Sequence, residues 1–374
     1  MKKTIFFLSL LATIIACSSG DNNGGDDSGG KNFDRTALLT NWADNIIIPS
    51  YENYQTKINT LSTDATAFTA APTEAGLQKL RSSWYEAYKA YQYVGIYGFG
   101  KALDINFKEI ANTYPTSKTG IEDNITSGTY NLSLQAQYAK QGLPALDYLL
   151  NGLGANDTEI TAFYTTNAKA ANYKKYVTDV TAKLKTTIDA VVTDWKTGGY
   201  RNAYIANTGT SVSGAVNVTT NNFVKNLEKD IRTVKLGIPA GLFSNGVKYP
   251  EKTEGLYKGN ASRELLNLSI KASQDFFNGK HFTSTTNGES LKTYLDFVNA
   301  VRDGKKLSEL INTQYAAVFT ANDNLNVSLA DQINADNTKV ISAYDVLQKN
   351  VIYTKLDMMQ ALNITIDYVD GDGD

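Results

Sequence analysis

The stretch EAGLQKLRSSWYEAYKAYQYV, from Glu74 to Val94, carries the pattern that decides the fold. Its large apolar and aromatic side chains recur at steps of three or four residues, which places them on one face of an α-helix. These side chains are Leu77, Leu80, Trp84, Ala87, Tyr88, Tyr91 and Val94. A stripe of this kind is typical of a helix that packs in a bundle. The stretch therefore predicts a long, half-buried bundle helix.

The same spacing runs through most of the chain after residue 32. Further helical stripes lie at 36–70, 172–197, 220–236, 262–278, 290–301, 307–320 and 339–362. Alternation of the kind that marks a strand is rare. It is clearest at 201–219, where Val212, Val216 and Val218 stand among Thr, Ser and Gly. We therefore expect an all-α protein with only a minor β hairpin in that segment.

The segment 198–220 (GGYRNAYIANTGTSVSGAVNVTT) is the best candidate for a domain boundary. It is long, rich in Gly, Thr and Asn, and lies between two helical blocks. We predict two four-helix-bundle-like domains packed side by side, at 33–197 and 221–374, with a linker or hairpin at 198–220. In each half a helix leads into a turn that contains Gly, YGFGKALD and IPAGLFSNGVKYPE. An internal duplication would explain this likeness.

The first 16 residues predict a lipoprotein signal peptide. A basic start is followed by the apolar run IFFLSLLATIIA, which is too short to span a bilayer. The run ends at IIAC, which resembles the bacterial lipobox and predicts cleavage before Cys17 and lipidation of that residue. Residues 17–32 then form a Gly-, Asn- and Asp-rich tether. Its acidic run resembles the export signals of surface lipoproteins in the Bacteroidetes. We expect a lipid anchor in the outer membrane, facing the periplasm or the cell surface.

Composition excludes several classes of function. A net charge of −2 and a pI of about 5.7 give no electrostatic basis for binding nucleic acid. A single His excludes a zinc peptidase with two imidazole ligands. That residue, His281, follows a helix that Gly279 should end, so we expect it at the surface or at the helix C-cap. Carboxylates and the 23 Tyr remain as candidate binding groups.

The stretch KQGLPALDYLLNG, from Lys140 to Gly152, places Pro144 and Asp147 three residues apart. Inside a helix Pro144 would cost about 3 kcal/mol, because it lacks an N–H and crowds the preceding turn. A helix that starts around Leu143 avoids this cost, since proline is tolerated in a first turn. Asp147 then has two interpretations. It is either a residue of the helix start that interacts with exposed amides, or a ligand.

Five blocks, in order along 33–374, resemble the imelysin-like family. They are LRSSWYEAYKAYQYVGIYGFGKA, NTYPTSKTGIEDNI, KQGLPALDYLLNG, VKLGIPAG and LNITIDYVDGDGD. The third block resembles the family's G-x-H-x-x-E segment. The resemblance implies two helical bundles with a cleft between them, and a role in bacterial iron acquisition. Some members of the family are described as metallopeptidases.

This chain departs from the family motif at two of its three positions. Gly142 keeps the glycine, but Pro144 replaces the histidine and Asp147 replaces the glutamate. Since proline has no ligand atom, we expect no metal ligands, no catalytic residues and no cofactor, and iron enters through the resemblance alone. We expect a non-catalytic binding protein. A metallopeptidase of the imelysin type, which the missing His disfavours, and a scaffold for another envelope protein stay open as alternatives.

The predicted cleft has six candidate ligand contacts. We expect Asp147, Glu122 and Asp123 as polar contacts, with Tyr93, Tyr97 and Tyr114 as an aromatic rim. Besides the membrane, we expect one partner of three kinds. It is a small ligand related to iron, a peptide or glycan, or another envelope protein.

Overall fold

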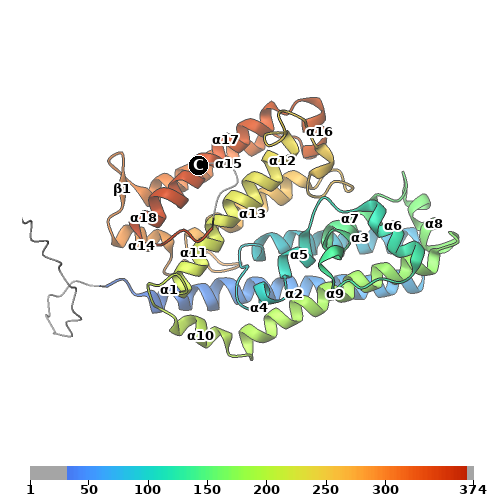
Figure 1. Cartoon of the computed structure of the whole chain (residues 1–374), viewed down its shortest axis with the longest axis horizontal. Coiled ribbons are helices and arrows are strands. Elements are labelled where there is room, and N and C mark those ends of the chain that lie inside the picture. Colours follow the sequence, from blue (N-terminus) through green and yellow to red (C-terminus); the bar gives the residue numbers. More distant parts are fainter. Residues whose placement is uncertain (1–31, 369–374) are drawn as a thin grey trace, which may run out of the picture. The chain divides into compact units, whose positions relative to one another are not determined.

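The stripe at 74–94 forms the helix α3 (Glu74–Val94) in the computed structural model, which describes residues 32–368 (Figure 1). The Thr73 hydroxyl begins this helix by accepting a hydrogen bond from the Gly76 amide at 3.1 Å. The predicted apolar face, from Leu77 to Val94, is buried. Two more long helices, α2 (Ile48–Ala70) and α9 (Ala170–Lys196), pack with α3 in a layer in which α2 contacts both of the others. The prediction of a bundle helix is confirmed.

The remaining elements between residues 32 and 196 are short, and the first two of them run directly into α2. They are α1 (Arg35–Asn41), η1 (Trp42–Ile47), α4 (Lys101–Asp104), α5 (Phe107–Asn112), α6 (Lys118–Ser127), η2 (Gln135–Lys140), α7 (Gly142–Asn151) and α8 (Asp157–Thr165). Of these, α7 and α8 both contact α3 and α9. Residues 32–196 therefore contain three long helices with the shorter ones packed against them (Figure 1).

The second half is also helical. Its elements are α10 (Tyr200–Ala206), α11 (Ala215–Lys225), η3 (Asn226–Gly237), α12 (Ile238–Ala240), η4 (Pro250–Lys252), α13 (Ser262–Phe277), α14 (Leu291–Phe297), β1 (Val301–Arg302), β2 (Lys305–Lys306), α15 (Leu307–Asp323), α16 (Leu329–Ala335), α17 (Thr338–Val351), η5 (Ile352–Met358) and α18 (Met359–Ala361). Here η3, α13, α15 and α17 form the packed group, and α13 contacts α3 of the first half. All predicted helical stripes are found as helices, with boundaries shifted by a few residues.

In the described part of the chain, three continuous helices contain a π-helical segment. These segments are η1 between α1 and α2, η3 between α11 and α12, and η5 between α17 and α18. The π-helix is rare in proteins and occurs mostly as single turns, frequently at functional sites. At 12 residues, η3 is much longer than a single turn. It forms one wall of the pocket described below.

The hairpin predicted within 201–219 is absent from that segment, which instead holds α10 and the start of α11. The buried residues Val216, Thr220 and Phe223 recur at helical spacing, so a short V-x-V alternation in this segment belongs to a helix. The small antiparallel hairpin of the structure is β1–β2, where Val301 pairs with Lys306. Its turn is Asp303-Gly304, and both residues have positive φ as a tight hairpin requires.

The described residues from Asp34 onward belong to one compact unit, and the division into two domains stays a prediction. Its core contains all three tryptophans, Trp42, Trp84 and Trp195, each at most 1% exposed. Within residues 32–368 no helix combines the length and the apolar character needed to cross a bilayer. Cys17 and the predicted signal peptide lie outside the described residues.

Candidate functional site

The helix that carries the motif, α7, begins at Gly142, where the backbone has a φ of +79°. A Cβ added at this position would lie 2.5 Å from the carbonyl oxygen of Ile110 and 2.6 Å from that of Ala111. Glycine is therefore required at position 142 for two reasons, the left-handed backbone conformation and the close approach of α7 to α5. Pro144 is the third residue of α7, in its first turn, as expected from the sequence.

Asp147 lies beyond the first turn, so the interpretation as a residue of the helix start is wrong. It is the sixth residue of α7 and is only 2% exposed. Its Oδ2 accepts a hydrogen bond from the Tyr257 amide at 2.9 Å, and its Oδ1 accepts from the Lys258 amide at 2.9 Å and from Asn151 Nδ2 at 3.1 Å. Burial raises the pKa of Asp147 to about 7, although these hydrogen bonds act to lower it. Asp147 thus binds the backbone of a distant loop.

The space around the motif residues is small. The motif pocket has a volume of about 20 Å³, enough for about one water molecule. Its lining residues are Tyr114, Pro115, Thr116, Pro144, Asp147, Glu251, Thr253, Gly255, Leu256 and Tyr257. No cluster of three His, Cys, Asp or Glu side chains in residues 32–368 could hold a metal ion. The residues at the motif therefore do not fit the metal that the family resemblance implies.

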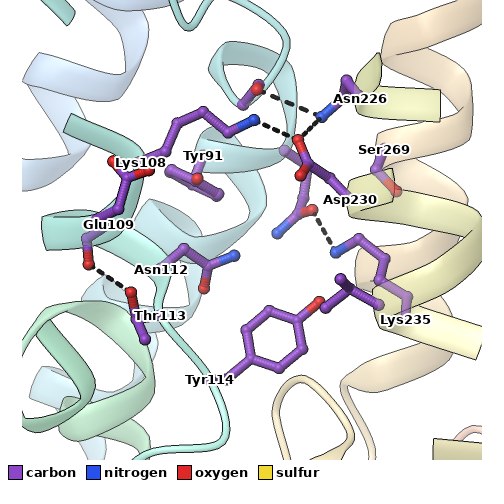
Figure 2. Close-up of a pocket in the computed structure, with 13 residues that line it drawn as sticks. Tyr91, Lys108, Glu109, Asn112, Thr113, Tyr114, Asn226, Asp230, Lys235 and Ser269 are labelled. Atoms are coloured by element: carbon purple, nitrogen blue, oxygen red, sulfur yellow. Dashed lines mark hydrogen bonds and ion pairs between the residues drawn. The ribbon is translucent and has the colours of Figure 1, made fainter. Parts of the chain in front are cut away.

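A larger pocket lies beside the motif pocket, with Tyr114 in the lining of both. We call it the polar pocket, and its volume is about 180 Å³. It is lined by Tyr91, Gln92, Gly95, Lys108, Glu109, Asn112, Thr113, Tyr114, Asn226, Asp230, Val234, Lys235 and Ser269 (Figure 2). These residues come from α3, α5 and the turn after it, η3 and α13. Both halves of the chain thus contribute to it.

Lys235 lines this pocket and forms a buried ion pair with Glu254, with side chains only 6% and 2% exposed. Glu254 Oε1 also accepts hydrogen bonds from Asn112 Nδ2 at 2.8 Å and from Gln92 Nε2 at 3.2 Å. Lys235 donates to Gln92 Oε1 at 3.0 Å. Because both charges are paired and hydrogen-bonded, they hold the pocket wall in one arrangement.

A second ion pair, between Lys108 and Asp230, joins α5 to η3 (Figure 2). Asn226 donates to Asp230 Oδ2 at 2.9 Å and to the Gly95 carbonyl oxygen at 3.3 Å, which connects the same segment to the end of α3. The pocket is therefore fixed across the contact between the two halves, and both of its lysines are paired with carboxylates.

One buried polar atom of the pocket lacks a partner within the described part of the chain. Asn112 Oδ1 is buried and accepts no hydrogen bond there. Figure 2 shows the side chains of Asn112, Tyr114 and Lys235 converging on the middle of the pocket. Burial, helped by nearby carboxylates, raises the pKa of Tyr91 and Tyr114 well above its usual value, so both phenols stay protonated. An unpartnered buried acceptor is costly, so this atom requires a donor from water or a ligand.

The structure does not bring the six predicted contacts to one cleft. Asp147 lies in the motif pocket, and Tyr114 lies in both the motif pocket and the polar pocket. Tyr93 and Tyr97 line a third pocket, beside the end of α3 and α13.

The two predicted acidic contacts on α6 lie elsewhere again. Glu122 Oε1 accepts a hydrogen bond from the Tyr148 hydroxyl at 2.8 Å, and its Oε2 accepts one from the Tyr173 hydroxyl at 2.6 Å. Asp123 is exposed. Glu122 therefore connects α6 to α7 and α9, a structural role.

Sequence reasoning missed the charged residues of the polar pocket. Lys235 offered a signal, because it continues the apolar stripe of Leu227 and Ile231 at a step of four residues. A lysine on an apolar face predicts a buried partner. Glu254 lies in a loop and offered none, since only the tertiary structure brings it to Lys235.

Comparison with known families agrees with the all-helical fold. A family model described as Imelysin matches residues 47–350. The chain belongs to the imelysin family. An imelysin-like protein from Psychrobacter arcticum has the same fold, with 19% identity and a TM-score of 0.68 over 89% of this chain and 97% of that one. A putative iron-regulated protein A precursor from Parabacteroides distasonis is also similar, with 16% identity and a TM-score of 0.71 over 88% of this chain and 97% of that one. No curated protein matches.

Proposed function

We propose that this imelysin-family protein binds a small polar ligand in the polar pocket and does not catalyse its conversion. The observation that carries the proposal is the buried oxygen of Asn112, which has no hydrogen-bond partner among the described residues. It faces a pocket of about 180 Å³ whose two lysines are already paired with carboxylates. A ligand that donates a hydrogen bond to this oxygen would compensate for its desolvation.

The size and charge of the pocket define the ligand class. An apolar cavity of about 150 Å³ holds one benzene ring, so the polar pocket accommodates a molecule of about one ring and is too small for haem. Since Lys108 pairs with Asp230 and Lys235 pairs with Glu254, an uncharged ligand avoids competing with either pair. Hydroxyl or amide donors suit Asn112. These features favour a monosaccharide or a small amide compound such as a capped amino acid.

The motif pocket supports the absence of catalysis. Pro144 offers no ligand atom, and both carboxylate oxygens of Asp147 accept hydrogen bonds from backbone amides. With room for about one water, the motif pocket admits no peptide bond. We therefore do not assign the metallopeptidase activity that is described for other family members.

The proposed setting is the bacterial envelope. A lipid on Cys17 would anchor the protein to the outer membrane, and residues 18–32 would serve as its tether. The name of the Parabacteroides distasonis neighbour, a putative iron-regulated protein A precursor, supports a setting in iron acquisition. In this proposal iron regulates the production of the protein, and no iron ion binds in the motif pocket.

Isothermal titration calorimetry of the purified protein tests the binding proposal. The probes are a set of neutral monosaccharides and N-acetyl amino acid amides. At least one should bind, and Ser269→Leu, which adds a large side chain at a lining residue, should abolish its binding. Asn112→Leu should weaken binding by tenfold or more, about the effect of one lost hydrogen bond to a buried group. The exposed residue Asn59 provides the matched control Asn59→Leu. Failure of every probe to bind, or binding that survives Ser269→Leu, would overturn the proposal.

Catalysis has its own assay. The purified protein is incubated with casein and with short peptides in the presence of Zn²⁺ or Fe²⁺. No cleavage is expected, because the motif residues supply no metal site. Cleavage that is lost in Asp147→Asn would show a peptidase and refute the non-catalytic assignment, whatever the binding result.

A further inference from the structure

A second large pocket lies at the contact between the end of α3 and α13, and it shares no lining residue with the polar pocket. We call it the aromatic pocket, and its volume is about 250 Å³. Its lining residues are Ile46, Ser50, Tyr93, Tyr97, Lys271, Ala272, Asp275, Phe276, Lys280, His281, Phe282 and Thr283. His281, which we expected at the surface or a C-cap, is a half-buried wall residue here.

Aromatic rings form the apolar part of this pocket. The rings of Tyr97 and Phe276 lie 5.9 Å apart between centroids, and those of Tyr93 and Phe282 lie 5.6 Å apart at an interplanar angle of 80°. Tyr97 and Phe276 are almost completely buried. Ring edges and faces arranged in this way favour a further aromatic ring as a neighbour.

The rim of the pocket carries more positive than negative charge. Asp275 is paired with Lys271 one helical turn before it, and Lys280 Nζ approaches the same carboxylate only to 3.7 Å. Two ammonium groups therefore share one carboxylate. The Tyr93 hydroxyl makes no hydrogen bond with the rest of the described chain, and burial raises the pKa of this phenol, with the charge of Asp275 adding to the effect. The rim thus offers a cation and a protonated phenol to an anion.

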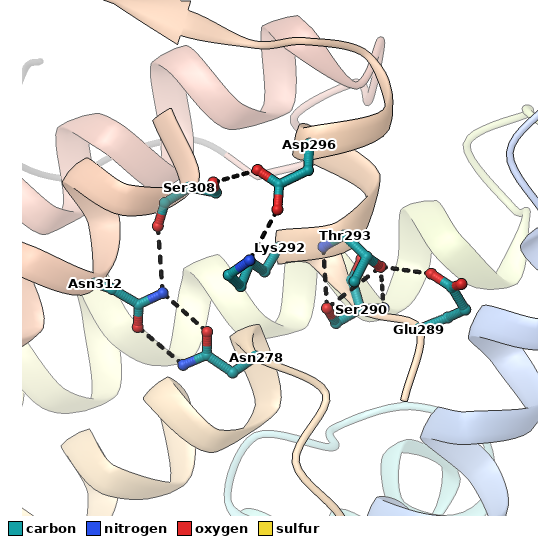
Figure 3. Close-up of polar contacts among 8 residues, drawn as sticks. All are labelled: Asn278, Glu289, Ser290, Lys292, Thr293, Asp296, Ser308 and Asn312. Carbon is teal, nitrogen blue, oxygen red and sulfur yellow. Dashed lines mark hydrogen bonds and ion pairs between the residues drawn. The ribbon is translucent and has the colours of Figure 1, made fainter. Parts of the chain in front are cut away.

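The loop that closes the pocket, residues 278–290, is held at both ends. At its start the side-chain amides of Asn278 and Asn312 exchange two hydrogen bonds of 2.9 Å, and at its end Ser290 and Thr293 form a capping box (Figure 3). Asn41 Nδ2 donates to the carbonyl oxygens at both ends, at 3.1 Å to Gly279 and 2.9 Å to Glu289. The wall is therefore fixed before any ligand arrives, which lowers the entropic cost of binding.

Within this loop Thr283 has a φ of +55°. Positive φ is a genuine outlier for a β-branched residue and costs of the order of 1–3 kcal/mol. The Phe282 amide donates to the Asn45 carbonyl oxygen at 2.7 Å, which holds the strained turn against the first helical segment. Strained residues of this kind cluster at ligand-binding sites. Thr283 itself lines the pocket.

We propose that the aromatic pocket binds a small aromatic carboxylate. The ring would lie among Tyr93, Tyr97 and Phe276, and the carboxylate would lie at the rim against Lys280. A volume of about 250 Å³ exceeds the roughly 150 Å³ that holds benzene, so one ring with a short acidic substituent fits and a long acyl chain does not. This site is independent of the polar pocket and goes beyond the function proposed for it.

Calorimetric titration of the purified protein with benzoate tests this site. Benzylamine, a cation of similar size, and octanoate, an anion with an aliphatic chain, are the comparison probes. Benzoate should bind at least tenfold more tightly than either, because only benzoate matches both the rings and the charge. No heat of binding with benzoate, equal binding of benzylamine, or tighter binding of octanoate would each overturn the assignment.

Two variants locate the bound probe. Lys280→Gln removes the cation at the rim that shares its carboxylate with Lys271, and should weaken benzoate binding about tenfold, the usual effect of one charge-assisted hydrogen bond. Ala272→Leu occupies the pocket from α13 and should abolish binding. Lys305→Gln, on the exposed strand β2, makes the same charge change outside the pocket and should leave binding unchanged. Equal benzoate affinity in Lys280→Gln and Lys305→Gln, or binding that survives Ala272→Leu, would refute the site.

Discussion

Asp147 Oδ2 accepts a 2.9 Å hydrogen bond from the backbone amide of Tyr257, 110 residues later in the chain. Together with the neighbouring bond from the Lys258 amide, this contact attaches the loop before α13 to the motif helix α7. A position that holds a glutamate in the family motif thus connects the two halves of this protein. The carboxylate stabilises the loop through hydrogen bonds, but its burial makes the charge costly.

This arrangement predicts a pH dependence of stability that belongs to Asp147. Burial raises its pKa from 3.8 to about 7 in the folded protein, while the unfolded chain titrates near 3.8. Between these values the folded state binds more protons, so the contribution of Asp147 to the free energy of unfolding falls as pH rises from about 4 to about 7. The loss is at most roughly 4 kcal/mol, at about 1.4 kcal/mol per pKa unit.

Urea unfolding of the wild type and of Asp147→Asn at several pH values measures this term. The stability difference, wild type minus variant, should decrease across that range, because the variant cannot titrate there. Asp123→Asn, which changes an exposed carboxylate on α6, should give no such trend. A difference for Asp147→Asn that is constant with pH would contradict the prediction.

The helices could be predicted from sequence because their signal is local. The stripes at 36–70 and 307–320 repeat over many turns, and burial follows the same repeat. The alternation at 201–219 was misleading because Val216 and Val218 are only two residues apart. So short a pattern does not distinguish a strand from a helix, and the helical face becomes clear only with the buried residues that follow.

The site was less predictable, for two physical reasons. The partners of Asp147 are backbone amides, which leave no signature in residue types. The partner of Lys235 is Glu254 in a loop, and only tertiary packing determines which carboxylate reaches a buried lysine. The loss of the motif histidine at Pro144 could be read directly, since proline has no ligand atom.

Gly142→Ala should destabilise the protein strongly. The substitution adds a side chain to a residue with φ of +79°, and its Cβ would lie within 2.6 Å of two backbone carbonyl oxygens of α5. Since backbone cannot move as easily as a side-chain end, the loss should be at least about 3 kcal/mol. Thermal unfolding measures it. Gly304→Ala is the matched control, because its φ is +72° but open space surrounds it. That control should cost only about 1 kcal/mol. Equal losses in the two variants would show that the contact with α5 is unimportant.

The buried pair of Lys235 and Glu254 predicts a large non-additive effect. Lys235→Met should lower the free energy of unfolding by about 3–5 kcal/mol, because it leaves the Glu254 carboxylate buried without a cation. Adding Glu254→Gln should restore most of this loss, since the second change removes the unpaired charge. Urea denaturation of the four proteins in the cycle gives the coupling.

A surface pair provides the control for this cycle. Lys175 and Asp179 lie one turn apart on α9, with side chains 55% and 34% exposed. Lys175→Met should cost no more than about 0.5 kcal/mol. If Lys235→Met and Glu254→Gln are simply additive, the two groups do not depend on each other and the proposed role of the pair is wrong.

Restoring the family motif should not restore a metal site. In Pro144→His/Asp147→Glu both ligand types return, and Glu251 also lines the motif pocket, but that pocket has room for only about one water. The two new side chains would themselves occupy this space, which leaves none for a divalent ion and its remaining ligands. After incubation with Zn²⁺ or Fe²⁺ and desalting, elemental analysis should therefore find far less than one metal ion per chain, as in the wild type. Asp147→Glu alone is the matched control for the changed carboxylate. One equivalent of metal in the double variant, absent from this control, would show that the pocket opens and that only the imidazole had been missing.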